Sequence, residues 1–188
     1  MKKRLLLLTG SPGVGKTSVL LRVVESLRTK GYSVGGMVSR EVRVDVARVG
    51  FEILDLNSGR KGWLAHVAQE QGPQVGRYRV NIEDLEGIGV GAIMDAVARS
   101  DAVALDEIGP MELHSQKFKQ AVRQAVQSSK LMVCVVHWKA TDSLLAEIRG
   151  RPDGEAYVVT RENRENLHAQ VVKEALVFLS GPSEKKAL

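Results

Sequence analysis

Four residues near the start of the chain have the types and the spacing of a phosphate-binding loop. Gly10, Gly15, Lys16 and Thr17 fit the pattern G-x-x-x-x-G-K-T within the segment GSPGVGKTS. Backbone N–H groups can wrap a polyphosphate closely only where side chains do not obstruct them, which is why such a loop needs glycine. The Lys16 ammonium would then contact the outer phosphates, and the Thr17 hydroxyl is a ligand for magnesium. The predicted nucleotide-binding loop consists of Gly10, Ser11, Pro12, Gly13, Val14, Gly15, Lys16, Thr17 and Ser18.

Two adjacent carboxylates follow a second short apolar segment, AVAL. Asp106 ends this segment at the position where a phosphate-loop protein places the carboxylate that holds magnesium, directly or through water. Glu107 can accept a hydrogen bond from a water molecule aimed at the terminal phosphorus. The sequence therefore predicts a hydrolase that uses Mg²⁺, with Thr17 and Asp106 at the metal and Lys16 and Glu107 as catalytic residues. A helix cap or a turn-forming residue is the alternative for Asp106, and a structural acid paired with a nearby arginine is the alternative for Glu107.

Apolar patterns predict the elements that position these residues. Strands are expected at 5–8, 32–38, 102–106, 131–136 and 156–159. Helices are expected from the loop to Gly31, from Asn81 to about 97, at 118–126, from Thr141 or Asp142 to 148, and at 167–179. The segments 49–56 and 62–67 flank Asn-Ser-Gly-Arg and predict an appended hairpin, followed by a loop with a short edge strand near Tyr78. Strands that alternate with helices predict an α/β fold, whose mostly parallel sheet is covered on both faces and binds ligands at the carboxyl ends of its strands.

Composition limits the class of protein. A chain of 188 residues with 44% hydrophobic and 26% charged residues fits one folded domain spanning 1–188, with a polar, frayed tail from 180 to 188. No apolar run approaches the length of a membrane span, and the single Cys134 lies inside an apolar segment, so a buried thiol in the reducing cytoplasm is expected. The net charge of +5 is spread along the chain, so nucleic acid is not expected as a partner.

Three further residues could lie near the terminal phosphate. His137 follows a predicted strand and could sense the phosphate, although a structural role is equally expected. Arg149 and Arg151 could form a charge clamp over the phosphates, an arrangement that accelerates phosphoryl transfer by a factor on the order of 10³. Exposure to solvent in a turn is the alternative for both arginines.

Four more residues are candidates at the border of the site. Glu41 and Arg43, just past the second strand, could face the cleft or pair with each other. Asn163 and Arg164, at the start of the last helix, could border the base or the ribose, and helix capping explains Asn163 equally well.

The segments GSPGVGKTS, EVR followed by RVGFEI, DEIGPMEL and TRENR together resemble a small nucleoside-triphosphatase family of archaea and thermophilic bacteria, which has a human relative called cancer-related nucleoside-triphosphatase. The resemblance covers nearly the whole chain. It implies a RecA-like P-loop fold, a three-layer sandwich with an extra strand between the loop strand and the acidic strand. It also implies slow, Mg²⁺-dependent hydrolysis of several nucleoside triphosphates to diphosphate and phosphate. The predicted strand at 32–38 is our candidate for the extra strand.

Three other functions are compatible with the same loop. A nucleoside or small-molecule kinase would transfer the phosphoryl group to a hydroxyl, and it would need an acceptor pocket beside Glu107. A nucleotide-gated switch selective for guanine would usually carry an Asn-Lys-x-Asp base reader, and the chain has no such tetrapeptide. A nucleic-acid-associated ATPase is the third possibility. Nucleoside triphosphates are the expected partners, no membrane partner is expected, and a monomer is the working expectation.

Overall fold

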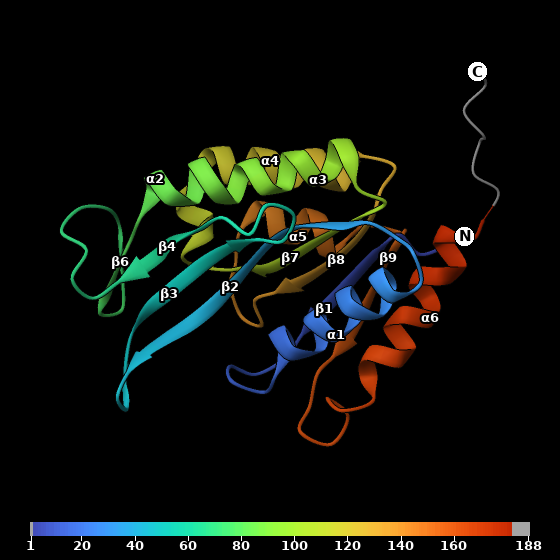
Figure 1. Cartoon of the computed structure of the whole chain (residues 1–188), viewed down its shortest axis with the longest axis horizontal. Helices are drawn as coiled ribbons and strands as arrows, with labels where there is room; N and C mark the ends of the chain where they lie inside the picture. The colour runs from blue at the N-terminus through green and yellow to red at the C-terminus, as the bar shows by residue number, and fades with distance from the viewer. Residues whose placement is uncertain (1, 182–188) are drawn as a thin grey trace.

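The computed structural model describes residues 2–181, and these residues form a nine-stranded mixed sheet with helices on both faces (Figure 1). The order of the strands across the sheet is β5-β6-β4-β3-β2-β7-β8-β1-β9. The strands are β1 (Leu5–Thr9), β2 (Val34–Val44), β3 (Ala47–Asp55), β4 (Lys61–His66), β5 (Gln74–Val75), β6 (Tyr78–Val80), β7 (Ala102–Ile108), β8 (Leu131–Val136) and β9 (Gly154–Val158). The helices are α1 (Lys16–Thr29), α2 (Ile82–Asp84), η1 (Leu85–Val90), α3 (Gly91–Arg99), η2 (Glu112–His114), α4 (Gln116–Gln127), α5 (Ser143–Arg149) and α6 (Leu167–Leu179).

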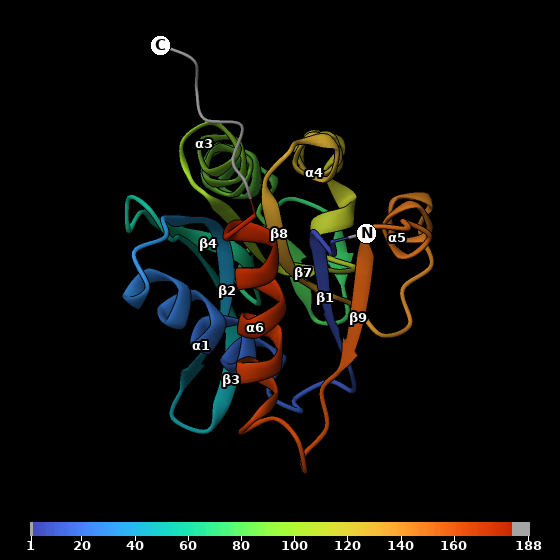
Figure 2. The ribbon, with the colours of Figure 1, turned by 90° about the vertical axis from the view of Figure 1, so that its right-hand side faces the viewer.

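Three layers make up the molecule, and their arrangement confirms the predicted fold class. Helices α1 and α6 cover one face of the sheet, and α3, α4 and α5 cover the other (Figures 1 and 2). Strands β1, β7 and β8 are nearly continuous runs of buried residues, as expected for parallel strands with helices on both sides. Cys134 is fully buried in β8, and burial raises the pKa of its thiol to about 12.

The strand between the loop strand and the acidic strand is β8, not the segment predicted from 32–38. Strand β8 pairs in parallel with both β1 and β7, whereas β2 lies on the far side of β7. Gly36 fits β2 closely to its neighbour, because its φ is +121° and an added Cβ would lie 2.0 Å from the carbonyl oxygen of Ala104. The order of these strands along the chain therefore differs from their order across the sheet.

Strand β2 is longer than the sequence predicted, and it begins the antiparallel half of the sheet. Its first five residues, from Val34, are buried, but beyond Val38 the side chains are half-buried or exposed. The hydrophobic pattern that predicted the strand therefore stops there, while pairing with β3 continues through Arg40 opposite Glu52 to Val44 opposite Ala47. The turn between the two strands contains Asp45, whose φ is +53°.

The predicted hairpin of β3 and β4 is confirmed as part of this antiparallel extension. Its turn is held by Asp55, whose carboxylate accepts a hydrogen bond from the backbone N–H of Asn57 at 2.9 Å. The predicted edge strand near Tyr78 is β6, and the sequence pattern missed its two-residue partner β5, which forms the outer edge.

The helix predicted from Asn81 is continuous from α2 through η1 to α3. The side-chain oxygen of Asn81 accepts a hydrogen bond from the backbone N–H of Asp84 at 3.0 Å and caps the helix. Its glycine-containing middle, η1, is π-helical. The predicted tail lies outside the described residues from 182 onward. Within residues 2–181, none of the helices combines the length and the apolar character needed to cross a bilayer.

Candidate active site

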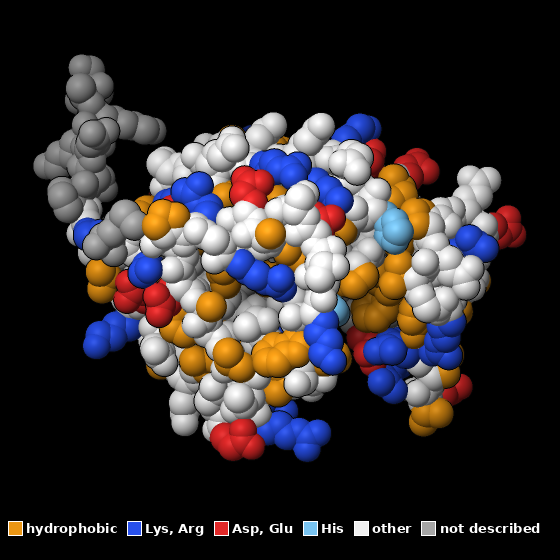
Figure 3. All heavy atoms as spheres, turned by 180° about the vertical axis from the view of Figure 1, so that it is seen from behind, with side chains coloured by type: hydrophobic (Ala, Val, Ile, Leu, Met, Phe, Trp, Pro, Cys, Tyr) orange, Lys and Arg blue, Asp and Glu red, His pale blue; other side chains and the backbone are white. Residues whose placement is uncertain are grey.

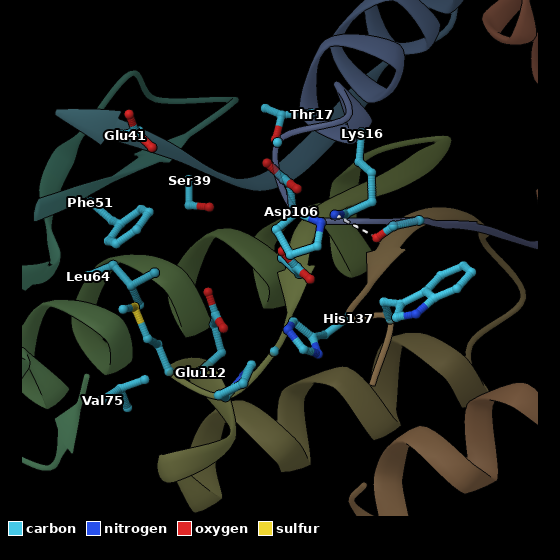
Figure 4. A pocket seen from close by; sticks show the side chains of 18 of the residues that line it. Lys16, Thr17, Ser39, Glu41, Phe51, Leu64, Val75, Asp106, Glu112 and His137 are labelled. Carbon is cyan, nitrogen blue, oxygen red and sulfur yellow. Dashed lines mark hydrogen bonds between the residues drawn. The ribbon is translucent and has the colours of Figure 1, made fainter. Parts of the chain in front are cut away.

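The carboxyl ends of β1, β7 and β8 open into a cavity of about 450 Å³ (Figure 4). The phosphate loop forms one side of this cavity, and the antiparallel strands β2 to β5 form the opposite side. The residues that line it are Gly10, Pro12, Gly13, Gly15, Lys16, Thr17, Ser39, Glu41, Arg48, Phe51, Leu64, Val75, Asp106, Glu107, Gly109, Pro110, Met111, Glu112, His137 and Trp138. The cavity thus joins the two motifs that the sequence separates by about 90 residues.

The loop turns directly from β1 into α1, so that the free N–H groups at the start of α1 face the cavity. Gly10 has a φ of +147°, and a Cβ there would lie 2.5 Å from the carbonyl oxygen of Val159, so this position requires glycine. The buried Lys16 ammonium donates hydrogen bonds to the carbonyl oxygens of Gly10 at 3.1 Å and Ser11 at 3.2 Å. The cation is therefore held at the loop itself, where the outer phosphates of a nucleotide would lie.

Asp106 is a buried acid, only 2% exposed, and its Oδ2 atom has no hydrogen-bond partner among the described residues. Burial raises the pKa of this carboxyl to about 7, and the charge of Glu107 adds to the rise, while the Thr17 hydroxyl and the Lys16 ammonium oppose it. Figure 4 shows the Thr17 hydroxyl directed toward Asp106. An unsatisfied carboxylate oxygen beside a hydroxyl is a donor set that suits a hard cation such as Mg²⁺.

Glu107 is mostly buried, and its Oε1 atom also lacks a hydrogen-bond partner among the described residues. Burial raises the pKa of this carboxyl, while Lys16 and, to a smaller extent, His137 lower it. The free oxygen is available to a ligand or to a water molecule in the cavity.

His137 lines the cavity at the end of β8. Its Nδ1 atom accepts hydrogen bonds from the backbone N–H groups of Ala140 at 2.9 Å and Lys139 at 3.3 Å. In the neutral ring the proton is therefore on Nε2, which has no hydrogen-bond partner within residues 2–181. Arg149 donates to the carbonyl oxygen of His137 at 2.7 Å, so it holds this turn from outside and is not a lining residue.

The structure separates Arg151 from the loop. Its guanidinium pairs with Asp153 at 2.8 Å, and Asp153 also pairs with Arg4 at 2.9 Å beside the amino end of β1. The loop lies at the other end of that strand, so the structure does not bring Arg151 to the cavity.

Asn163 and Arg164 lie on the outer side of the loop, next to α6. The Asn163 side chain accepts a hydrogen bond from the backbone N–H of Thr160 at 2.9 Å and donates one to the carbonyl oxygen of Val158 at 2.8 Å. The side chain of Arg164 packs over Gly15, where an added Cβ would lie 3.3 Å from its Cδ atom. Arg164 is therefore adjacent to the loop, and Asn163 stabilises the turn that carries it.

Glu41 and Arg43 pair with each other at 2.5 Å on the solvent side of β2, and Glu41 also lines the cavity. Sequence reasoning missed Arg48, which lies opposite on β3 and pairs with Glu41 at 2.8 Å. These ion pairs lower the pKa of the Glu41 carboxyl and keep it ionised. Arg48 is the fifth residue after Arg43 in the chain, and only the β2–β3 pairing places the two opposite each other.

A second group of lining residues was also missed by sequence reasoning. Glu112 is 4% exposed and extends from η2 into the cavity (Figure 4). Burial raises the pKa of its carboxyl to about 8, with smaller contributions from the charges of Glu107 and Asp106. Phe51, Leu64 and Val75 form an apolar wall facing it. The sequence did offer an indication of Glu112, because it lies in the segment DEIGPMEL together with Asp106 and Glu107.

The parallel strands, the glycine loop at the start of α1 and the acids at the end of β7 define a P-loop nucleotide-binding protein. The NTPase family model matches residues 5–172, and the chain belongs to that family. It is an enzyme of the hydrolase class.

Similar proteins cover nearly the whole chain. Nucleoside-triphosphatase THEP1 of Thermofilum pendens is 46% identical over 169 residues, which are 89% of this chain and 93% of the relative. THEP1 of Methanothermobacter thermautotrophicus is 40% identical over 167 residues, with coverage of 89% and 93%. The crystal structure of THEP1 from the hyperthermophile Aquifex aeolicus superposes with a TM-score of 0.80 at 30% identity, covering 90% of this chain and 97% of that one. The solution structure of a human cancer-related nucleoside triphosphatase gives 0.79 at 35% identity, with coverage of 90% and 96%.

Proposed function

We propose that this protein hydrolyses nucleoside 5′-triphosphates to nucleoside diphosphate and phosphate in a Mg²⁺-dependent reaction. The observation that carries the proposal is the placement of Lys16 and Thr17 opposite Asp106 and Glu107 in one cavity. The names of the relatives, nucleoside-triphosphatase, support the same substrate class.

Thr17 and Asp106 are the residues that would hold Mg²⁺, because the Oδ2 atom of Asp106 has no partner among the described residues and the Thr17 hydroxyl points toward the carboxylate (Figure 4). When bound, the ion neutralises charge on the β- and γ-phosphates.

The chain's own residues have distinct roles in the proposed reaction. Backbone N–H groups of the loop and the start of α1 bind the phosphate oxygens, and Lys16 stabilises the negative charge that accumulates as the terminal phosphoryl group leaves. Glu107 accepts a hydrogen bond from water and orients its oxygen toward the terminal phosphorus. A bond forms between the water oxygen and phosphorus, the bond from phosphorus to the β–γ bridging oxygen breaks, and the proton of the water passes to Glu107. We propose that His137 donates a hydrogen bond from Nε2 to a phosphate oxygen.

We propose broad base specificity, so that ATP, GTP, CTP and UTP are all substrates. Arg164 is among the residues adjacent to the outer side of the loop, and the nearby Asn163 is already engaged with Thr160 and Val158. A guanidinium can stack on any base, which makes such a border tolerant of the base. We also propose that the protein acts in the cytoplasm as a monomer, which fits the buried Cys134 thiol.

Release of phosphate from the four common nucleoside triphosphates, measured with and without Mg²⁺, tests the reaction, the metal and the base preference together. We expect release from all four with Mg²⁺ and almost none after the metal is chelated. A strict preference for one base would contradict the proposed specificity, and equal rates without Mg²⁺ would contradict the role of Asp106.

Glu107→Gln tests the water-positioning role separately. The variant should bind nucleotide with unchanged affinity by calorimetry and hydrolyse it about 10² to 10⁴ times more slowly, because the amide cannot accept the proton. Glu70→Gln is the matched control, since Glu70 is exposed and outside the cavity. Wild-type turnover in Glu107→Gln would leave Glu107 with a structural role only.

A further inference from the structure

The cavity of about 450 Å³ extends beyond the loop and the acids to an apolar wall formed by Phe51, Leu64 and Val75, which the proposed hydrolysis does not use. Part of it lies beyond Asp106 and Glu107 as seen from the loop. We call this part the second pocket and define it by Glu41, Phe51, Leu64, Val75, Met111 and Glu112. We propose that the second pocket binds a nucleoside, and that the enzyme transfers the terminal phosphoryl group of the triphosphate to a hydroxyl of that nucleoside. The inference rests on the proposed function.

The position of the second pocket excludes it as the site for the base of the triphosphate itself. Lys16 and Glu107 mark the end of the site at which the terminal phosphate would lie. The nucleoside of the triphosphate extends from the opposite end of the phosphate chain, toward Arg164 and α6. Whatever occupies the second pocket therefore faces the terminal phosphorus from the side of the attacking group, as a phosphoryl acceptor does.

The wall of the second pocket suits a flat, largely apolar ligand group. Figure 4 shows Phe51, Leu64 and Val75 on one side of the cavity. The Phe51 ring is held by the edge of the Tyr78 ring, with centroids 5.3 Å apart at 72°, and by the Arg48 guanidinium 5.3 Å from its centroid. Seen from behind, the molecule is hollowed at this place, and hydrophobic side chains line the hollow next to a cluster of basic and acidic side chains (Figure 3). A nucleobase has the shape and the π-face for such a wall.

The polar groups of the second pocket suit the edge of a base. Glu112 is nearly fully buried and is directed into the cavity from η2 (Figure 4). A buried carboxyl group can accept and, when protonated, also donate a hydrogen bond, which matches the adjacent donors and acceptors of a base. Ser39, a half-buried residue directly after the buried part of β2, adds a hydroxyl to the cavity.

The charges favour a nucleoside over a nucleoside monophosphate as the acceptor. The six residues that define the second pocket include no lysine or arginine, and Arg48, which lines the cavity beside them, is paired with Glu41 at 2.8 Å. Glu107 and Glu112 line the same space. A phosphate on the acceptor would add a dianion next to these acids, with no bidentate arginine to bind it.

The transfer balances in the same way as hydrolysis, with the acceptor hydroxyl in place of water. A bond forms between the hydroxyl oxygen of the nucleoside and the terminal phosphorus, and the bond to the β–γ bridging oxygen breaks. The hydroxyl proton passes to Glu107. The products are a nucleoside diphosphate and a nucleoside monophosphate.

The experiment incubates wild-type protein with ATP labelled at the γ-phosphate, Mg²⁺ and, in separate reactions, adenosine, guanosine, cytidine, uridine and the four monophosphates. Labelled nucleotides are separated by chromatography, and free phosphate is measured in the same tubes. We expect labelled monophosphate from at least one nucleoside, and binding of that nucleoside in saturation-transfer NMR. Val75→Trp, which fills the second pocket, should lower the ratio of transfer to hydrolysis at least tenfold. Val46→Trp, at a position that is 88% exposed on the β2–β3 turn, should leave the ratio unchanged.

Each contrary outcome overturns a defined part of the inference. Continued phosphate release with no nucleoside bound and no monophosphate formed overturns the acceptor site and leaves the hydrolase proposal standing. Labelled diphosphate from added monophosphates, in place of monophosphate from nucleosides, overturns the choice of acceptor. Equal ratios in Val75→Trp and Val46→Trp overturn the location of the site. The absence of phosphate release in every tube overturns the proposed function together with this one.

Discussion

Lys16 shows how a single charge is kept in place before a ligand arrives. Its ammonium is bound by two carbonyl oxygens of the loop that it serves, those of Gly10 and Ser11. A nucleotide phosphate offers the same cation full negative charges in place of partial ones. The cation can therefore exchange backbone partners for phosphate oxygens with little movement of the side chain.

Lys16→Ala should lower the rate of phosphate release at least about 100-fold, because the variant loses the cation that stabilises charge on the leaving phosphoryl group. The measurement is release of phosphate at saturating ATP and Mg²⁺. Lys61→Ala is the control, because Lys61 is exposed and pairs with Glu52 away from the loop. Hydrolysis at the wild-type rate in Lys16→Ala would show that the loop is not the site.

Asp153 makes a pH-dependent contribution to folding outside the cavity. Arg151 and Arg4 bind its carboxylate and lower its pKa from 3.8 to about 2. Because the folded pKa lies below the unfolded one, this stability is present at neutral pH and is lost as pH falls from about 4 to about 2. The shift corresponds to about 2 kcal/mol.

Asp153→Asn should reduce the free energy of unfolding at pH 7 by about 2 kcal/mol, since it leaves the buried Arg4 without its carboxylate partner. Urea unfolding at pH 7 and at pH 3 measures the effect, and the two proteins should differ less at pH 3. Glu155→Gln is the control, because Glu155 is 46% exposed and pairs with Lys3 at 3.7 Å. A constant difference at both pH values would rule out the proposed linkage.

At the scale of elements, the hydrophobic pattern of the sequence predicts the parallel strands and their helices, whereas it predicts the antiparallel strands only in part. Strands β1, β7 and β8 are buried on both faces, so their apolar runs predict them directly. The outer half of β2 carries polar, exposed side chains, and its backbone pairing with β3 leaves no trace in the hydrophobic pattern. A hydrophobic pattern does not predict a strand whose side chains form ion pairs with those of the neighbouring strand.

Gly36→Ala should lower the free energy of unfolding by more than about 3 kcal/mol. Its positive φ is strained for alanine, and the added Cβ would collide with the carbonyl oxygen of Ala104 at 2.0 Å. The control is Gly91→Ala at the start of α3, where nothing lies within 4 Å of an added Cβ. Gly91→Ala should raise stability by about 0.5–1 kcal/mol through helix propensity. Equal effects of the two changes in thermal unfolding would contradict the close packing of β2 on β7.

At the scale of the whole molecule, the proposed active site joins two halves of one sheet. The parallel half supplies Lys16, Asp106 and Glu107, which the sequence predicts from motif spacing. The antiparallel half supplies Glu41, Arg48 and Phe51, and only Glu41 was among the sequence candidates. Motifs for phosphate chemistry have fixed local spacing, whereas the opposite wall is assembled from side chains brought together by strand pairing.

The two halves should differ in local stability, because β5 and β6 form a short outer hairpin while β8 is fully buried at the centre of the parallel strands. Amide hydrogen exchange should therefore be at least about tenfold slower in β8 than in β6. Adding nucleotide with Mg²⁺ should slow exchange most at the start of α1. Equal protection of β6 and β8 would show that the sheet opens as one unit.

Strand β8 separates the loop strand β1 from the acidic strand β7. Two strand spacings amount to roughly 10 Å, so a bound triphosphate would touch β1 with its phosphates and β7 through the acids. Such a ligand would link two strands that share no hydrogen bonds. It would bind the folded chain and not the unfolded chain. A free ligand concentration of 100 times the dissociation constant would then add about 2.7 kcal/mol to the free energy of unfolding. The heat resistance of this enzyme would thus depend on how much of its own substrate surrounds it.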